Sequence, residues 1–286
     1  MPEEKLTIEH LELLYPRFKK MRSPISEYSF SNLYLFRRIH DYKVIHDGDI
    51  FIKGVSYDKK NFLMPTEDLR SSDFGKLKKY LARADFLFPV PEEWLSIFNK
   101  EEFDVSSMDS ESDYMYSTDK ISSYRGSKLH KKRNLLKQFL ALYKYEACPL
   151  TNERLSDARI ILDAWQESTR ESRDDNDYYA CGEALELYEE LILCGGIYYA
   201  QNQPAGFIIG EELNSETFVI QFAKANIKFK GIYQYMYNTF AKILPAKYKY
   251  LNFEQDMGKE ALRIAKSSYL PDIMLKKYRV SLRANA

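Results

Sequence analysis

The second half of the chain alternates between helix-like and strand-like runs of apolar residues. After Pro149, apolar side chains recur at helical spacing, and Asn152 can cap the helix that they predict. A second helix around 184–193 leads into three strand-like runs separated by turn residues, which predict an antiparallel meander over 196–201, 205–211 and 216–224. Gly231 then opens a helix that Pro245 ends. The remaining pattern predicts a strand, a short helix and a last strand, over 248–253, 259–267 and 273–280.

This order of elements has a geometric consequence. The strand ending at Lys224 and the strand beginning at Tyr248 are joined by a helix, so the two should form a parallel crossover pair. A sheet that changes from a meander to a parallel pair opens at the change, and ligands bind beyond the carboxyl ends of such strands. Polar residues follow both predicted strand ends: Lys224, Asn226, Lys228, Lys230 and Gly231 at one, and Asn252, Glu254, Gln255 and Asp256 at the other.

The first half has a similar but less regular pattern. It predicts a helix that carries Ile8 and Phe18, a hairpin at Asp47-Gly48, a strand over 61–64 and a helix over 74–81. A strand over 85–88, a helix over 91–98 and a long helix over 117–145 follow. We therefore predict an α/β (α+β) chain of two tandem units, each a mixed sheet flanked by helices, with domains at 1–147 and 148–286.

Composition is typical of a soluble folded protein. The chain has 286 residues, of which 45% are hydrophobic and 29% charged, and this length suits two domains. Its three cysteines form no CxxC motif and its four histidines show no HExxH or facing pair, so we expect neither a disulfide framework nor a metal site. No signal peptide and no apolar run of membrane-spanning length is visible. A cytoplasmic location is expected; the oligomeric state is left open.

Charge is balanced overall but unevenly distributed. Lys plus Arg and Asp plus Glu both number 42, which excludes a uniformly basic DNA-binding protein. From Lys224 to the end, however, 13 basic residues face 4 acidic ones, whereas residues 101–119 hold seven carboxylates and no Lys or Arg. A second basic cluster occupies 128–133. These runs are either solvated faces or the walls of a basic concavity for an anionic ligand.

Several segments resemble the C-terminal domain of phosphatidylglycerol lysyltransferases: 231–234, 252–258, 262–263, 266–278 and, less densely, 124–134. The resemblance implies two tandem GNAT-like domains, as in the Fem-type aminoacyltransferases, and transfer of an amino acid from aminoacyl-tRNA to an amine or a lipid hydroxyl. The chain departs from the lipid enzymes in showing no membrane-spanning segment. It departs from CoA-dependent enzymes at 228–233, where one glycine of two is kept and Tyr233 would crowd a phosphate. Aminoacyl-tRNA is therefore favoured over acyl-CoA as donor, and no certain cofactor is expected.

Glu254 is the preferred general base for such a transfer, with Asp256 as a second catalytic candidate. Either carboxylate, Asp256 above all, could instead cap the helix near Gly258. Basic and polar groups near the predicted opening could bind the carrier: Lys228, Lys230, Gly231, Asn252, Arg263, Lys266, Tyr269, Lys276 and Lys277. Of the adjacent pair Lys276 and Lys277, only one can face a crevice. The residues Lys131, Lys132 and Arg133 could dock tRNA phosphates or an anionic lipid head group, or simply form a solvated helix face.

Other functions fit the same pattern. The leading interpretation is an aminoacyl- or acyltransferase. Three alternatives stay open, because a fold does not guarantee its chemistry. They are a CoA-dependent N-acetyltransferase, a catalytically silent module that binds an anionic ligand, and an RNA-binding accessory protein.

Overall fold

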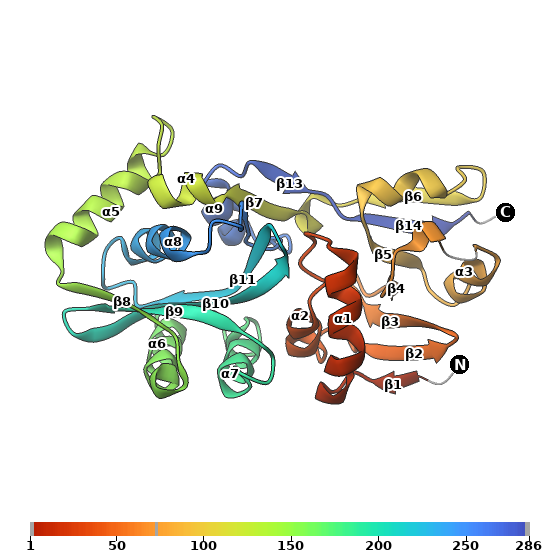
Figure 1. Cartoon of the computed structure of the whole chain (residues 1–286), viewed down its shortest axis with the longest axis horizontal. Helices are drawn as coiled ribbons and strands as arrows, with labels where there is room; N and C mark the ends of the chain where they lie inside the picture. Colours follow the sequence, from red (N-terminus) through yellow and green to blue (C-terminus); the bar gives the residue numbers. More distant parts are fainter. Residues whose placement is uncertain (1–2, 72–73, 284–286) are drawn as a thin grey trace. The chain divides into compact units, whose positions relative to one another are not determined.

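The computed structural model describes residues 3–71 and 74–283, which form two compact units (Figure 1). The first unit takes its described residues from Met1–Tyr114, Gln255–Arg263 and Met274–Ala286, and the second from Met115–Glu254 and Ile264–Ile273. The predicted boundary between residues 147 and 148 falls inside strand β8 (Tyr145–Pro149). The division into domains at that point stays a prediction.

The first unit is built on a seven-stranded mixed sheet. In spatial order its strands are β1 (Glu3–Lys5), β2 (Lys43–Asp47), β3 (Asp49–Val55), β4 (Asn61–Pro65), β5 (Phe86–Val90), β14 (Tyr278–Leu282) and β6 (Phe103–Ser107). Helices α1 (Leu11–Met21) and α2 (Phe30–Phe36) lie on one side of β2–β4 and α3 (Phe74–Leu81) on the other (Figure 1). The predicted hairpin is confirmed. The helix predicted over 91–98 is a 3-10 segment, Glu92–Ile97.

The last predicted strand, 273–280, is wrong as a single element. It is two strands: β13 (Ile273–Leu275), which belongs to the second sheet, and β14, which pairs antiparallel with both β5 and β6 in the first. The chain leaves the strand conformation at Lys276 and Lys277. The two strands belong to different sheets, and the side chain of Lys277 in the gap between them is fully buried.

Lys277 is the centre of a buried ion cluster in the first unit. Its ammonium lies 2.7 Å from Glu27 Oε2 and 2.6 Å from Asp113 Oδ1, and it donates hydrogen bonds to Gln255 Oε1 and Ser26 Oγ. Burial acts against the charged amine, but the two carboxylates outweigh it and raise the pKa of Lys277. For Glu27, burial is the largest influence and raises its pKa. The cluster binds the start of β14 to residues 26–27 and 113, which are distant in sequence.

The second unit has its own seven-stranded mixed sheet. In spatial order its strands are β13, β7 (Asp113–Ser117), β12 (Tyr250–Asn252), β11 (Thr217–Ala225), β10 (Gln203–Asn214), β9 (Cys194–Ala200) and β8. The predicted meander is confirmed as β9–β10–β11. Helices α6 (Leu155–Ser168) and α7 (Tyr178–Glu186) cover one face of the sheet and α8 (Ile232–Ile243) the other (Figure 1). The helix expected around 184–193 overlaps α7 only over 184–186, because α7 begins at Tyr178 and ends at Glu186.

The long helix predicted over 117–145 is also wrong. Residues 113–117 form β7, and two helices follow, α4 (Thr118–Ser123) and α5 (His130–Leu142). The break occurs at Tyr124 and Gly126, which both have left-handed backbone conformations with φ of 47° and 94°. Of α5 only Phe139 is fully buried, whereas Leu140 is exposed. The short helix α9 (Glu260–Ser267) forms as predicted. Among the helices of residues 3–71 and 74–283, none is long and apolar enough to cross a bilayer.

Replacing Lys277 with methionine should destabilise the protein strongly, because Glu27 and Asp113 would remain buried without their cation. We expect the free energy of unfolding to fall by about 3–5 kcal/mol, measured as a lower midpoint in urea. Lys276 is the matched control, since it is adjacent but exposed, and Lys276→Met should change stability by less than about 0.5 kcal/mol. Equal shifts for the two variants would contradict the role of the cluster.

Candidate functional site

The second sheet splits between β11 and β12. The two strands are parallel, as predicted, but they pair only over Thr217–Val219 and Tyr250–Asn252. β12 ends there, while β11 continues to Ala225. On its other side β12 pairs antiparallel with β7. The carboxyl end of β12 therefore leaves the sheet beside a stretch of β11 that extends past it, which is where ligands bind in sheets of this type.

The strand exit at Asn252 is held in an unusual backbone conformation. Asn252 is fully buried, and its Oδ1 accepts a hydrogen bond of 2.7 Å from the backbone N–H of Glu254. Glu254 has a φ of 58°, in the left-handed region that side chains other than glycine seldom adopt. Strained backbone of this kind concentrates at functional sites. The local turn thus fixes where the half-buried Glu254 side chain begins.

Aromatic side chains pack beside this exit. The ring of Phe253, which follows β12, lies 4.7 Å from the rings of both Tyr116 and Tyr237, and Tyr237 lies 5.5 Å from Tyr269. Tyr237 comes from α8 and Tyr116 from β7. Burial raises the pKa of Tyr237 and Tyr269 above the usual range, so their hydroxyls are neutral at physiological pH. The exit of β12 is therefore lined by neutral aromatic groups.

Polar groups connect this aromatic cluster to Glu254. Gln234 Nε2 donates to the hydroxyl of Tyr269 over 2.9 Å. The hydroxyl of Tyr116 donates to the carbonyl of Lys266 over 2.7 Å, and the ammonium of Lys266 donates to the carbonyl of Glu254 over 3.2 Å. The predicted residues Glu254, Lys266 and Tyr269 are thus brought together.

Lys132 joins the cluster from α5. Its ammonium lies 3.8 Å from the centre of the Tyr269 ring and 2.6 Å from Ser268 Oγ. Burial lowers the pKa of Lys132 to about 8, since a low-dielectric environment disfavours the charged amine. A lysine with a pKa in this range can bind an anion and can also exchange a proton near neutral pH.

Gly231 has a packing role at the start of α8. Its φ is 87°, and a Cβ placed on it would lie 2.3 Å from the carbonyl oxygen of Leu135 in α5. Backbone of α5 therefore packs directly against Gly231 at the start of α8. The glycine is required both by its conformation and by this contact.

The other basic candidates of the second unit have different environments. Lys228, Lys230 and Lys131 are exposed. Arg133 donates to the backbone carbonyls of Tyr124 and Gly126, and so stabilises the break between α4 and α5.

Lys224, expected beside the opening, is buried. It forms an ion pair of 2.6 Å with Asp177, and its ammonium lies 3.6 Å from the Trp165 ring. A cation held in this way contributes to the packing around α6 and α7 rather than to an open surface.

Four candidates lie in the first unit. Asp256 accepts hydrogen bonds from Arg263, from the Tyr114 hydroxyl and from the backbone N–H of Gly258. Burial opposes its ionisation, but these donors outweigh that influence and lower the pKa of Asp256. Asp256 therefore stabilises the turn at Gly258 that precedes α9, and its lowered pKa makes it a weak base. Lys276 is exposed and Lys277 lies in the ion cluster described above.

Two histidines that looked scattered in the sequence meet at one carboxylate in the first unit. Glu4 Oε1 lies 3.0 Å from His10 Nε2 and 3.2 Å from His46 Nε2. The backbone N–H of Thr7 donates to His10 Nδ1, so the proton of a neutral His10 is on Nε2 and points at Glu4. A metal ion at Nε2 would have to displace this proton. The arrangement fits a hydrogen-bonded cluster better than a metal centre.

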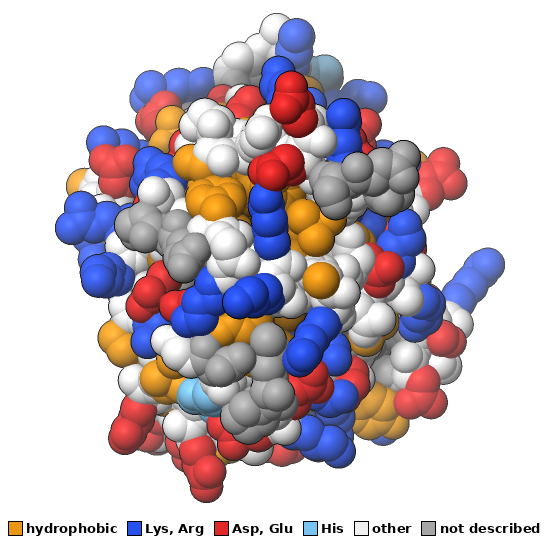
Figure 2. All heavy atoms as spheres, turned by 90° about the vertical axis from the view of Figure 1, so that its right-hand side faces the viewer, with side chains coloured by type: hydrophobic (Ala, Val, Ile, Leu, Met, Phe, Trp, Pro, Cys, Tyr) orange, Lys and Arg blue, Asp and Glu red, His pale blue; other side chains and the backbone are white. Residues whose placement is uncertain are grey.

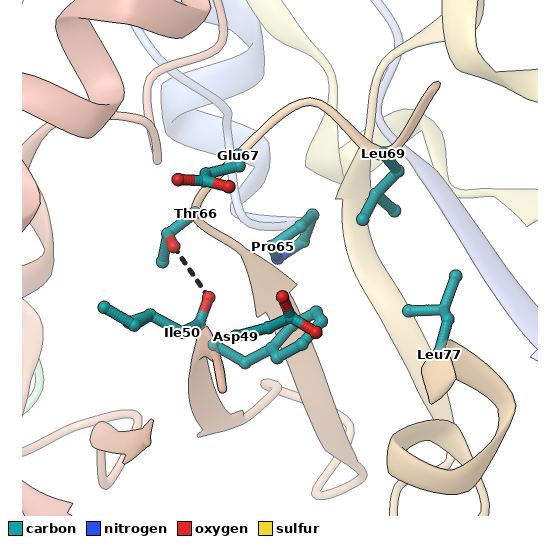
Figure 3. A pocket seen from close by; sticks show the side chains of 8 residues that line it. Asp49, Ile50, Pro65, Thr66, Glu67, Leu69 and Leu77 are labelled. Atoms are coloured by element: carbon teal, nitrogen blue, oxygen red, sulfur yellow. Dashed lines mark hydrogen bonds between the residues drawn. The ribbon is translucent and has the colours of Figure 1, made fainter. Parts of the chain in front are cut away.

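A small pocket in the first unit lies between β3, β4 and α3 (Figure 3). Its polar groups already have partners. The Thr66 hydroxyl donates to the carbonyl of Ile50, Glu67 pairs with Arg17, and Asp49 pairs with Lys76. It contains none of the residues predicted from the sequence.

Sequence reasoning missed Gln234, Tyr237 and the aromatic residues around them. Aromatic side chains in α/β proteins are usually core residues, so they carried no functional weight. One signal was present: Gln234 directly follows Tyr233 in the segment that carries the family resemblance, and Tyr233 and Tyr237 are four residues apart on one face of α8.

The family model "Phosphatidylglycerol lysyltransferase, C-terminal" matches residues 18–281. The chain belongs to this family. Its fold class, two mixed sheets flanked by helices in a tandem GNAT-like acyltransferase arrangement, is the one expected from the sequence. Membership of this family, together with the fold, supports an aminoacyl- or acyltransferase.

Three proteins illustrate what the chain is similar to. A conserved protein of unknown function from Bacteroides thetaiotaomicron is 26% identical, with a TM-score of 0.86 over 99% of this chain and 100% of that one. The structure of L-PGS from Bacillus licheniformis is 15% identical, with a TM-score of 0.63 over 99% and 94% of the chains. This second likeness shows the fold alone. The protein MYCGA3080 from Mycoplasmoides gallisepticum is 25% identical over 203 residues, which are 69% of this chain and only 64% of that protein.

Replacing Gly231 with alanine should test its packing role. The left-handed backbone costs a non-glycine residue about 1–2 kcal/mol, and overlap with the Leu135 carbonyl adds about 1–3 kcal/mol. Gly126 is the matched control, because it also has a positive φ but nothing lies within 4 Å of its added Cβ. Gly126→Ala should show only the backbone cost in urea unfolding. Equal losses in the two variants would contradict the close contact with α5.

The pKa of Lys132 predicts a pH dependence of stability. Between pH 8 and 10.5 the folded protein binds fewer protons at this amine than the unfolded chain, whose lysine has the ordinary pKa of 10.5. Stability contributed by this group must therefore rise with pH across this window. We expect Lys132→Met to show a smaller rise in urea midpoint from pH 8 to pH 10 than the wild type. Lys131→Met, an exposed neighbour, should retain the wild-type slope; a wild-type slope in Lys132→Met would refute the assignment.

Proposed function

We propose that this chain transfers an aminoacyl group from aminoacyl-tRNA to an amine or hydroxyl acceptor. The observation that carries the proposal is the convergence of Lys132, Glu254 and Lys266 at the split between β11 and β12. Membership of the lysyltransferase family supports acyl transfer as the reaction class.

The proposed chemistry is an attack on an ester. The nitrogen or oxygen of the acceptor forms a bond to the carbonyl carbon of the aminoacyl ester, and the bond from that carbon to the ribose oxygen of tRNA breaks. Glu254 accepts the proton that the acceptor loses, and the departing ribose oxygen takes up a proton. A positioned base of this kind contributes about 10²–10⁴-fold to the rate.

Cations beside the strand exit suit an anionic donor. Lys132 and Lys266 lie next to the aromatic cluster, and a phosphate of the tRNA acceptor end would find two ammonium groups there. The segment 228–233, which keeps one glycine of two and includes Tyr233, works against acyl-CoA, because a CoA pyrophosphate needs close access to the start of the helix. Aminoacyl-tRNA, which is found in the cytoplasm, is therefore the proposed donor. An anionic phospholipid head group is one acceptor of the hydroxyl class.

Incubation with tRNA carrying radiolabelled lysine should move label to an acceptor, with amines and phosphatidylglycerol tested in separate reactions. Replacing Glu254 with glutamine should lower the rate by about 10²-fold or more, while tRNA binding in a filter assay is unchanged. Glu260→Gln, an exposed carboxylate on α9, is the matched control and should keep the wild-type rate.

Two results would redirect the proposal. Transfer from acetyl-CoA but not from charged tRNA would favour a CoA-dependent acetyltransferase. Binding of charged tRNA without loss of label to any acceptor would favour the catalytically silent binding module.

A further inference from the structure

Three segments of the second unit meet where α5 ends. The backbone N–H of Gln201 donates to the carbonyl of Lys144, and its side chain donates to the carbonyl of Leu142. The Tyr143 hydroxyl accepts a hydrogen bond from the backbone N–H of Lys230. Lys228 donates to Gln203. Residues 142–145, 201–203 and 226–230 therefore form one continuous surface at this end of the second unit.

This surface combines exposed apolar side chains with lysines. Leu142 is 57% exposed, Tyr145 48% and Ile227 61%. Lys144, Lys228 and Lys230 are exposed beside them. We call these six residues the α5–β8 patch.

The chain keeps carboxylates out of the segments that form this patch. No Asp or Glu occurs between Asp119 and Glu146, although eight Lys or Arg do, and none occurs between Glu216 and Glu254. Glu146 follows Tyr145 on the strand, so its side chain points to the opposite face, where it accepts from Cys148. By contrast, on the face seen in Figure 2, Lys and Arg side chains lie among Asp and Glu side chains.

We propose that the α5–β8 patch docks on the surface of an anionic phospholipid bilayer. Lysines at such a surface are attracted by the negative head groups, and aliphatic and tyrosine side chains enter the boundary between head groups and acyl chains. The patch supplies both kinds of group side by side. This inference does not depend on the proposed transfer reaction, since docking needs no donor.

The apolar side chains distinguish a bilayer from RNA. Lysines alone would suit the phosphates of either partner. Exposed Leu142 and Ile227 gain nothing from a phosphate backbone, whereas a bilayer removes their surface from water. Single-stranded RNA would stack its bases on aromatic rings, and Tyr145 supplies the one ring among the six residues of the patch.

Flotation with vesicles tests the proposal on the full chain. Vesicles of phosphatidylcholine mixed with phosphatidylglycerol should carry the protein upward, pure phosphatidylcholine vesicles should not, and added salt should weaken the binding. The double variant Leu142→Asp/Ile227→Asp should lose affinity by more than about tenfold, because two apolar contacts are removed. Replacing Ile160 on α6, which is 57% exposed, with aspartate gives the matched control with unchanged binding.

Retained vesicle binding in the double variant would overturn the proposal. A second result would also overturn it: the protein does not bind the anionic vesicles, but it binds tRNA in a salt-sensitive way that depends on Lys144, Lys228 and Lys230. That result would assign the patch to RNA. The transfer assay on water-soluble amines reports separately on the proposed function. Loss of vesicle binding with normal transfer to amines in the double variant supports docking as a property distinct from chemistry.

Discussion

The site depends on a mismatch in strand length. β12 has three paired residues, which bond to β11 on one side and β7 on the other, while β11 extends to Ala225. A strand that leaves a sheet early must satisfy its next backbone groups locally. Asn252 does so with its side chain, and Glu254 takes a left-handed conformation in that turn. The position of the proposed base follows from this constraint rather than from the identity of the side chain alone.

The packing of α5 on α8 is the second constraint. Gly231 allows the Leu135 carbonyl to approach, and Phe139 stacks on Tyr235 with ring centres 4.6 Å apart. These contacts hold α5 so that Lys132 lies over Tyr269. The same orientation leaves Lys131 and the end of the helix exposed. One helix thus presents a partly desolvated lysine to the strand exit and a basic, partly apolar surface to solvent.

Local pattern was sufficient for the meander and the parallel pair, because each is made of elements that follow one another directly along the chain. It was insufficient where distant partners decide. The helix predicted over 117–145 missed the left-handed break at Tyr124 and Gly126, and it missed strand β7, whose partner β12 lies more than 130 residues away. Asp113, at the start of that strand, also binds Lys277. In the same way, the alternation of side chains along a strand predicts that Lys276 and Lys277 face opposite sides. It does not predict that Lys277 lies between two carboxylates.

The basic residues that make the charge of the sequence uneven do not all have the same role in the structure. Lys277, Lys224 and Arg279 are buried in ion pairs, and Arg263 neutralises Asp256. A buried cation must be paired, since its desolvation is costly, so these residues have no charge to offer a ligand. Only lysines whose neighbouring segments lack carboxylates can create an attractive field. The informative features of the sequence are therefore the two stretches without Asp or Glu, 120–145 and 217–253, which carry α5 and α8.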